Sequence, residues 1–456
     1  MNQVACEMLI VFALSPSTNK EMNMNRSITV LIIAFISICA FMVPTAYAGK
    51  GGPTKGWDYV GATNIKNNPG LIHYEWETER YPYDQFDKIA LHRFVYEPNN
   101  RKLISERPAP DKRKVIFIIP GTWSQGSSKG TDPEITTSLF LALNGYDVYS
   151  MDFRTKYLPN HAYDQYAQFG MDISSTANWT YDLFREDIKA CVNLTKKLSR
   201  AKKIFLAGRS RGSTQMYIYA SKYWRQDLKG LISLDGGIKG KPPIEVADLS
   251  PEEIEEATEA YEASVEIFKD TGTLLSEVSG YELGQFAGQI PYSTSNLNGP
   301  LPPNFNNVSE LIAYGAYYAW GAGLVTNIYT PYPDNSGETY MDLNVLVDIY
   351  SNFTRYWPER QNLESAAFRT YDDCPFLDYD DNLDKVDIPV IAFGGELTCR
   401  GGCTEDSSTY YSAHMTKTND VTVVYLPGYG HLDVYAGTHS LEDVKQPLLE
   451  WLDMRR

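Results

Sequence analysis

The sequence predicts an α/β protein with a mostly parallel, doubly wound sheet and a helical cap inserted into its second half. Three observations support this fold class. Short apolar runs alternate with helical stretches from residue 114 to about residue 239, the alternation stops between residues 240 and 373, and it returns from residue 374 onward. Strands that alternate with amphipathic helices are typical of a parallel sheet covered by helices on both faces.

The first part of the core, residues 49–239, supplies most of the sheet. Predicted strands cover residues 115–119, 146–151, 203–207 and 230–234, and predicted helices cover residues 131–143, 181–198 and 212–224. Asn144 and Gly145 end the first of these helices, because asparagine and glycine favour a helix C-terminus.

The inserted segment, residues 240–373, is predicted to form a cap or lid. Ser250 and Glu253 have the spacing of a capping box, which predicts a helix that runs to about Lys269. Residues 311–324 combine small and aromatic side chains. The tyrosines between Tyr281 and Tyr371 either line a pocket for an aryl or polymer-derived ester or pack the cap's own core. The alternation returns in the second part of the core, residues 374–456, with strands at residues 388–393 and 421–425 and a closing helix at residues 441–452.

Residues 1–48 have the pattern of a secretory signal peptide preceded by an upstream extension. Arg26 supplies the positive charge, residues 28–43 are almost entirely apolar, and Ala46-Tyr47-Ala48 forms a small-x-small cleavage site. The apolar run is short for a membrane span. We therefore expect cleavage after Ala48 and a secreted protein, extracellular or periplasmic, without stable membrane insertion. An uncleaved anchor is the alternative.

An oxidising compartment changes the interpretation of the cysteines, because thiols pair there. Cys399 and Cys403 flank a flexible Arg-Gly-Gly segment and can pair with each other, whereas Cys374 with either of them is the alternative. Cys191 lies in a helical pattern and is predicted to be a buried thiol. No histidine lies at ligand spacing from these cysteines, so we predict no metal site and no cofactor.

The overall negative charge of the chain argues against polyanionic partners. A formal net charge of -16 argues against binding to nucleic acid or to an anionic membrane. The 33 tyrosines of the chain suit a cleft for aromatic or sugar-like material, and they suit ordinary packing equally well.

The stretch Gly208-Arg209-Ser210-Arg211-Gly212 fits the pattern G-x-S-x-G. A predicted strand enters it and a predicted helix leaves it, as a nucleophile on a strained strand-to-helix turn requires. The alternative is a small residue in a glycine-rich loop. We predict that Ser210 is a catalytic nucleophile.

A serine hydroxyl needs a base to act as a nucleophile, and the chain has six histidines. His73 and His92 precede the predicted sheet, His161 lies in a polar loop, His414 lies in a helical stretch, and His439 begins the last helix. His431 instead lies in a loop directly after a predicted strand and before the closing helix. We predict that His431 is the base, with a surface-loop histidine as the alternative.

The carboxylate that orients the base remains open between several residues. Glu396 follows the predicted strand 388–393 and is the first choice. Asp235 follows strand 230–234 and is the alternative acid, and Asp406 is a third choice. Asp433 is too close in sequence to His431 for this role and is expected to support the histidine loop.

The developing negative charge on the substrate needs two backbone N–H groups, an oxyanion hole. Arg211, directly after the predicted nucleophile, supplies one of them. The loop after strand 115–119 supplies the other, from Thr122 or alternatively from Trp123.

Taken together, residues 85–455, apart from the insertion, resemble the α/β-hydrolase superfamily, and several segments resemble secreted serine esterases and lipases of the acid-lipase branch. The similar segments are residues 146–149 with 152–154, 179–183, 208–213 and 430–433. The resemblance implies the order nucleophile, acid, histidine and a helical cap over the site. The chain departs from that branch at Pro120, where the branch has histidine. It also departs after the penultimate strand, where the branch has an aspartate and this chain has Gly394-Gly395-Glu396-Leu397.

The resemblance implies a secreted serine hydrolase that cleaves carboxylic esters through a Ser-His-acid triad and an acyl-enzyme intermediate. The expected substrate is a small-molecule or polymer-derived ester. A peptidase, a thioesterase or an acyltransferase on the same triad is the alternative within enzymes, since the cap sets the substrate. A non-catalytic binding protein on this scaffold is the alternative outside them.

Overall fold

The computed structural model describes residues 56–97, 114–127, 130, 132–159, 172–271, 274–278, 345, 348–349, 351–396, 398 and 404–455. All of them lie within the unit Ala48–Arg456. The predictions for the signal peptide, for Cys399 and Cys403, and for residues 311–324 fall outside the described residues.

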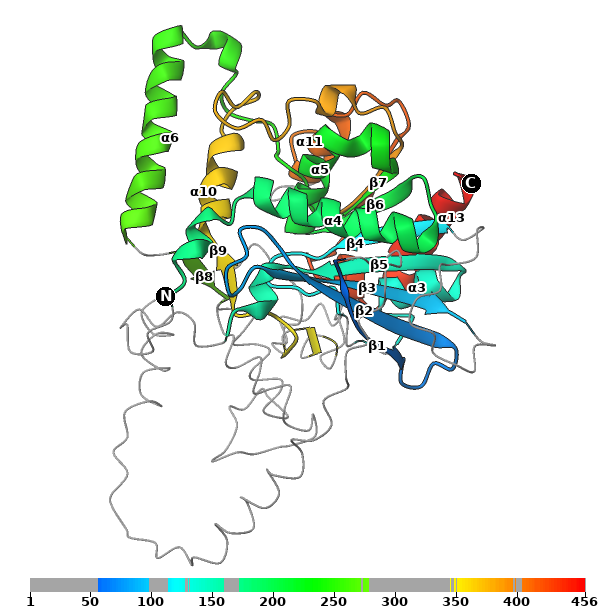
Figure 1. The fold of residues 1–456 in the computed structure, drawn as a ribbon. Coiled ribbons are helices and arrows are strands. Elements are labelled where there is room, and N and C mark those ends of the chain that lie inside the picture. The colour runs from blue at the N-terminus through cyan, green and yellow to red at the C-terminus, as the bar shows by residue number, and fades with distance from the viewer. Residues whose placement is uncertain are drawn as a thin grey trace, which may run out of the picture. The chain divides into compact units, whose positions relative to one another are not determined.

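Nine strands within the described residues form one sheet, in the order β1-β2-β3-β5-β4-β6-β7-β10-β11 (Figure 1). The strands are β1 Asp58–Asn64, β2 Leu71–Glu79, β3 Lys88–Tyr96, β4 Lys114–Ile119, β5 Tyr146–Asp152, β6 Ile204–Arg209, β7 Leu228–Leu234, β10 Val390–Gly395 and β11 Val421–Leu426. Every pairing from β5 through to β11 is parallel. The predicted mostly parallel sheet is therefore confirmed.

The antiparallel edge made by β1, β2 and β3 was not predicted. His73 and His92 lie in β2 and β3, so our expectation that these histidines precede the sheet is wrong. In β2 buried side chains alternate with less buried and charged ones, because only one face of this strand packs against the core. Such a half-polar strand lacks the continuous apolar run that identifies β4.

Helices cover both faces of the sheet. The helices are α3 Thr137–Leu143, α4 Tyr181–Ser199, α5 Arg211–Asp227, α6 Pro251–Thr271, α10 Glu359–Phe368, α11 Ser408–His414, α12 Asp433–Ala436 and α13 Gln446–Met454. Phe117 of β4 packs in the core with residues of α4 and α5, whereas its neighbour Ile118 packs in the core with residues of α3 and α13. This alternation follows from the pleat of a strand. Helix α3 begins later than predicted, because residues 132–136 form a turn.

The first α-helix of the inserted segment is α6, which Figure 1 shows to one side of the sheet with α10 beside it. The predicted capping box is present: the N–H of Ser250 donates to Glu253 Oε2 at 2.8 Å, and the N–H of Glu253 donates to Ser250 Oγ at 3.2 Å. Strands β8 Leu275–Glu277 and β9 Tyr356–Pro358 then form a short antiparallel pair. No helix in the described part of the chain is both long and apolar enough to span a membrane.

Two cysteines can be placed. Cys191 of α4 is a buried free thiol, as predicted. Cys374 is also a buried free thiol, so the alternative in which it pairs with Cys399 or Cys403 is wrong. Burial raises the pKa of the Cys374 thiol, which keeps it protonated and unreactive.

Candidate active site

Ser210 lies on a sharp turn between the end of β6 and the start of α5. Its backbone angles, φ 54° and ψ -125°, fall in a region that residues other than glycine rarely adopt. The N–H of Ser210 donates to the carbonyl of Leu234 at 3.0 Å, and the N–H of Ser213 donates to the carbonyl of Ser210 at 2.9 Å. Hydrogen bonds on both sides therefore hold this strained turn in place.

Both glycines of the motif are required by close backbone contacts. A Cβ on Gly208 would lie 2.3 Å from the carbonyl oxygen of Gly212, and a Cβ on Gly212 would lie 2.4 Å from the carbonyl oxygen of Ile119. Real Cβ atoms do not approach backbone this closely. The motif thus lets β6, α5 and the end of β4 converge at the serine.

His431 lies between β11 and α12, and its imidazole contacts an aspartate from another strand end. The Nδ1 atom of His431 lies 2.5 Å from Oδ2 of Asp235. The Asp235 side chain is 2% exposed and that of His431 is 12% exposed. The other carboxylate oxygen, Oδ1, accepts hydrogen bonds from the N–H of Gly395 and from Thr398 Oγ1, both at 2.9 Å. These bonds fix the carboxylate so that it orients the imidazole.

The first-choice acid, Glu396, points elsewhere. Its carboxylate accepts the N–H of Gly428 at 2.7 Å, and this hydrogen bond lowers the pKa of the Glu396 carboxyl. Asp406, the third choice, lies 3.7 Å from the ammonium of Lys241. The geometry favours Asp235, which stood as the alternative. Because β7 and β10 are neighbours in the sheet, Asp235 and Glu396 both start from the same edge, and only the local backbone decides between them.

Asp433 supports the histidine loop, as expected. Its Oδ2 accepts the N–H of Gly430 at 2.7 Å, directly before His431. The side chain is fully buried. Burial, and secondarily the negative charge of Asp235, raise the pKa of Asp433 to about 7.

One cavity of about 350 Å³ brings the predicted site residues together. The described residues that line it include Ser210, His431, Asp235, Thr122, Trp123 and Arg211. A Cβ on Gly121 would lie 3.0 Å from Cβ of Ser210, so the loop with Thr122 and Trp123 lies directly against the serine. Arg211 is the first residue of α5, and its N–H therefore has no acceptor within the helix. Glu396 does not line this cavity.

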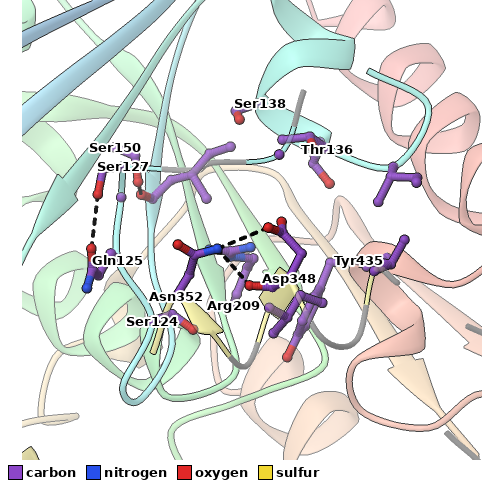
Figure 2. A pocket seen from close by; sticks show the side chains of 18 of the residues that line it. Ser124, Gln125, Ser127, Thr136, Ser138, Ser150, Arg209, Asp348, Asn352 and Tyr435 are labelled. Carbon is purple, nitrogen blue, oxygen red and sulfur yellow. Dashed lines mark hydrogen bonds between the residues drawn. The ribbon is translucent and has the colours of Figure 1, made fainter. Parts of the chain in front are cut away.

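A second cavity of about 270 Å³ adjoins the first (Figure 2). The two share Ser124, Arg209, Phe353, Leu432 and Tyr435. The sequence pointed to Arg209 only as a neighbour of the serine, and Phe353 and Tyr435 were missed. The only feature of the sequence that points to Tyr435 is its position shortly after the predicted base, His431. The centroids of the two rings lie 5.9 Å apart.

A separate group of side chains has the spacing of metal ligands. Atoms of His73, Glu75 and His92 lie within 4.8 Å of one another. However, Nδ1 of His92 lies 2.9 Å from Nε2 of His73, and Nε2 of His92 lies 2.9 Å from Oδ2 of Asp152. Both nitrogens of His92 are therefore engaged within the protein, and we assign this group a structural role.

Comparisons with known proteins agree with this architecture. No protein-family model matches the chain, and no curated protein matches it. The chain is similar to a putative lipase from Sulfolobus solfataricus of known crystal structure, with 27% identity and a TM-score of 0.59 over 87% of this chain and 99% of that one. This similarity and the sheet topology show that the chain has the α/β-hydrolase fold.

Two further solved structures are more distant. The monoacylglycerol lipase of Paleococcus ferrophilus has 13% identity and a TM-score of 0.39, over 77% of this chain and 97% of that one. A thermostable carboxyl esterase from Bacillus coagulans has 13% identity and a TM-score of 0.42, over 88% of this chain and 98% of that one. Neither likeness is close enough to carry an argument about this chain.

Proposed function

We propose that this α/β-hydrolase is a serine hydrolase of carboxylic esters with the triad Ser210, His431 and Asp235. The observation that carries the proposal is the 2.5 Å contact between His431 and Asp235 in the cavity that Ser210 also lines. The similarity to the Sulfolobus solfataricus putative lipase supports an ester substrate.

In the proposed mechanism Asp235 holds Nδ1 of His431, which leaves Nε2 to accept a proton from Ser210. The hydroxyl oxygen of Ser210 then attacks the ester carbonyl carbon. Backbone N–H groups of Thr122 and Arg211 stabilise the negative charge that develops on the carbonyl oxygen. His431 gives its proton to the leaving alcohol, and the acyl group stays on Ser210. Water repeats the sequence, releases the acid and regenerates the serine.

Hydrolysis of p-nitrophenyl acetate, butyrate and octanoate by the purified protein tests this proposal. We expect turnover by the wild type and a loss of roughly four to six orders of magnitude in kcat for Ser210→Ala, since the nucleophile acts as one unit with its base. A fluorophosphonate probe should label the wild type at Ser210 and leave the variant unlabelled. A Ser210→Ala protein that keeps most of its activity contradicts the assignment, and turnover of thioesters or peptides alone would point to another acyl-transfer reaction.

We also propose that the protein is secreted, on the basis of the signal-like pattern in residues 28–48. Expression of the full chain in a secreting host should release a protein whose N-terminal sequence begins at Gly49. A cell-associated protein that retains residues 1–48 would contradict this proposal.

A further inference from the structure

Positive charge accumulates around the candidate nucleophile. Three arginines line its cavity, Arg209, Arg211 and Arg369. Among the described lining residues the only carboxylate is Asp235, which already contacts His431. The chain as a whole carries a formal net charge of -16, so composition alone does not explain three cations in one cavity.

Two of these arginines are held by neutral groups. Nη2 of Arg211 donates to Asn362 Oδ1 at 2.7 Å, and its guanidinium lies over the ring of Trp357, although its Nη1 is buried without a hydrogen-bond partner. Nε of Arg369 donates to the carbonyl of Ile238 at 3.1 Å. Neither guanidinium forms an ion pair with any carboxylate in the part of the chain that the structure describes.

Arg209 is held least of the three. Its guanidinium faces the ring of Tyr435 at 5.4 Å, and its Nε is buried without a hydrogen-bond partner. Within the described residues it has neither a hydrogen bond from its side chain nor an ion pair. Burial lowers the pKa of Arg209, although an arginine stays protonated at neutral pH. Arg209 as a whole is half-buried, and a charge that is partly removed from water without a partner is still costly.

Arg209 also lies where a ligand can reach it, because it lines both cavities. Figure 2 labels it among the residues of the second cavity. The second cavity is also lined by two carboxylates, Asp132 and Asp348. Those carboxylates would repel an anion in the second cavity. The nucleophile's cavity, with its three arginines, is the side on which an anion is favoured.

We propose that Arg209 binds a carboxylate of the substrate, and that the substrates are esters that carry a free carboxylate near the scissile bond. Arg211 and Arg369 add positive potential without being the direct partners. This proposal rests on the proposed ester hydrolysis and specifies its substrate class. A guanidinium binds a carboxylate through two parallel N–H···O bonds, which would satisfy the unpaired Arg209 on substrate binding.

Matched ester pairs test the proposal. The mono-p-nitrophenyl esters of succinate, glutarate and adipate are compared with p-nitrophenyl butyrate, pentanoate and hexanoate, which lack the terminal carboxylate. A second pair, 4-acetoxybenzoate and phenyl acetate, moves the carboxylate to the alcohol side. In at least one series we expect kcat/KM of the wild type to be roughly 10- to 100-fold higher for the anionic ester, as a hydrogen bond to a charged group allows. High salt should reduce this preference.

Substitutions of single arginines test whether the preference for anionic esters depends on Arg209. Arg209→Gln should abolish the preference mainly through KM, and Arg209→Lys should restore part of it, because lysine keeps the charge but not the planar fork. Arg225→Gln is the matched control, since Arg225 is an exposed arginine near the other end of α5. This variant should keep the wild-type preference. The wild-type comparison needs no variant, so a misfolded Arg209→Gln protein does not remove the test.

The possible failures are distinguishable. If the wild type hydrolyses neutral esters and shows no preference for anionic ones in either series, the inference is wrong and the proposed function stands. If the wild type turns over no ester at all, the proposed function fails and calorimetric titration with glutarate decides the inference. Glutarate binding that Arg209→Gln weakens would support the anion site, and no binding by the wild type would overturn it.

Discussion

Two histidine–aspartate pairs in this molecule have similar contacts and different surroundings. His431 lies 2.5 Å from Asp235, and His92 lies 2.9 Å from Asp152. The His92 and Asp152 side chains are both 0% exposed, and His73 contacts the other nitrogen of His92. The imidazole of His431 instead borders the cavity of Ser210. A histidine–aspartate contact therefore does not by itself identify a catalytic pair, because the second nitrogen must also be open to a nucleophile.

The buried pair has a structural task. Oδ1 of Asp152 accepts the N–H groups of Gly126 and Ser127, at 2.6 and 3.1 Å, and so holds the loop that follows Trp123. Burial alone would raise the pKa of Asp152, but His92 and Lys156 lower it well below its usual range. Burial, followed by the charge of His92, lowers the pKa of His73 to about 3, so His73 is neutral at physiological pH. The group fixes a loop and leaves no base for chemistry.

The largest expected effect concerns the pair at the cavity. Asp235→Asn should lower kcat for p-nitrophenyl butyrate by roughly 10⁴-fold, because an amide cannot hold the imidazole in the required tautomer or stabilise its positive charge. Glu396→Gln is the control and should stay within a few-fold of the wild type. The reverse result, with Glu396→Gln inactive and Asp235→Asn active, would return the acid role to Glu396.

A substitution in the buried His92–Asp152 pair should lower the stability of the folded protein rather than the reaction rate. Asp152→Asn removes one partner of a buried ionic group, which costs about 3–5 kcal/mol of unfolding free energy. Urea unfolding at neutral pH measures this loss. The kcat of the molecules that remain folded should fall far less than in Asp235→Asn. An unchanged unfolding midpoint would show that this pair does not anchor the loop.

The raised pKa of Asp433 should make the stability of the folded protein depend on pH. That pKa is raised to about 7 in the folded protein, so the folded state binds more protons than the unfolded state between about pH 4 and pH 7. The contribution of this carboxyl to stability is therefore lost as pH rises through that window. Asp433→Asn should gain roughly 1–3 kcal/mol relative to the wild type on going from pH 5 to pH 8.

Denaturant unfolding at several pH values measures this difference for Asp433→Asn. Glu450→Gln, which changes an exposed carboxylate on α13, is the control and should show no such pH-dependent gain. A constant difference between Asp433→Asn and the wild type across this range would contradict the raised pKa.

The smallest expected effect concerns the hydrogen bonds that hold Asp235, the proposed triad acid. Thr398→Val removes the hydrogen bond that Thr398 Oγ1 donates to Asp235, while the N–H of Gly395 still donates to the same oxygen. The loss of one hydrogen bond of about 1 kcal/mol should reduce kcat roughly five-fold. Thr398→Ser should retain the wild-type rate. A loss as large as that of Asp235→Asn would mean that the whole loop had moved.

The sequence singles out Ser210 and His431, which the structure brings to one cavity, because each has a local signal. Ser210 has glycines at fixed offsets between a strand and a helix, and His431 follows a strand. The acid has no such signal, since Asp235 and Glu396 follow neighbouring strands. The choice depends on the backbone at Asp235, whose φ is 49° and whose N–H donates to the carbonyl of Phe393. That conformation is a tertiary property and cannot be read from periodicity.

Tertiary structure also explains why the sequence did not predict the antiparallel strands or the proposed role of Arg209. Strand β1 has no fully buried side chain, β2 has a polar face, and the buried strand β3 contains His92 and Arg93. Their patterns are therefore weaker than those of the apolar parallel strands. The unpaired state of Arg209 depends on which residues from distant segments surround it, and the sequence shows only that it precedes the serine.

The contact between His431 and Asp235 joins residues 196 positions apart. Because a domain folds as a unit, a polypeptide that is still being synthesised contains Ser210 long before the segment with its proposed base has been added. Chains that stop short of the final strand and loop would therefore be inert. Activity would appear only when the last segment docks, and an ester assay would report completed folding of the whole unit as directly as it reports chemistry.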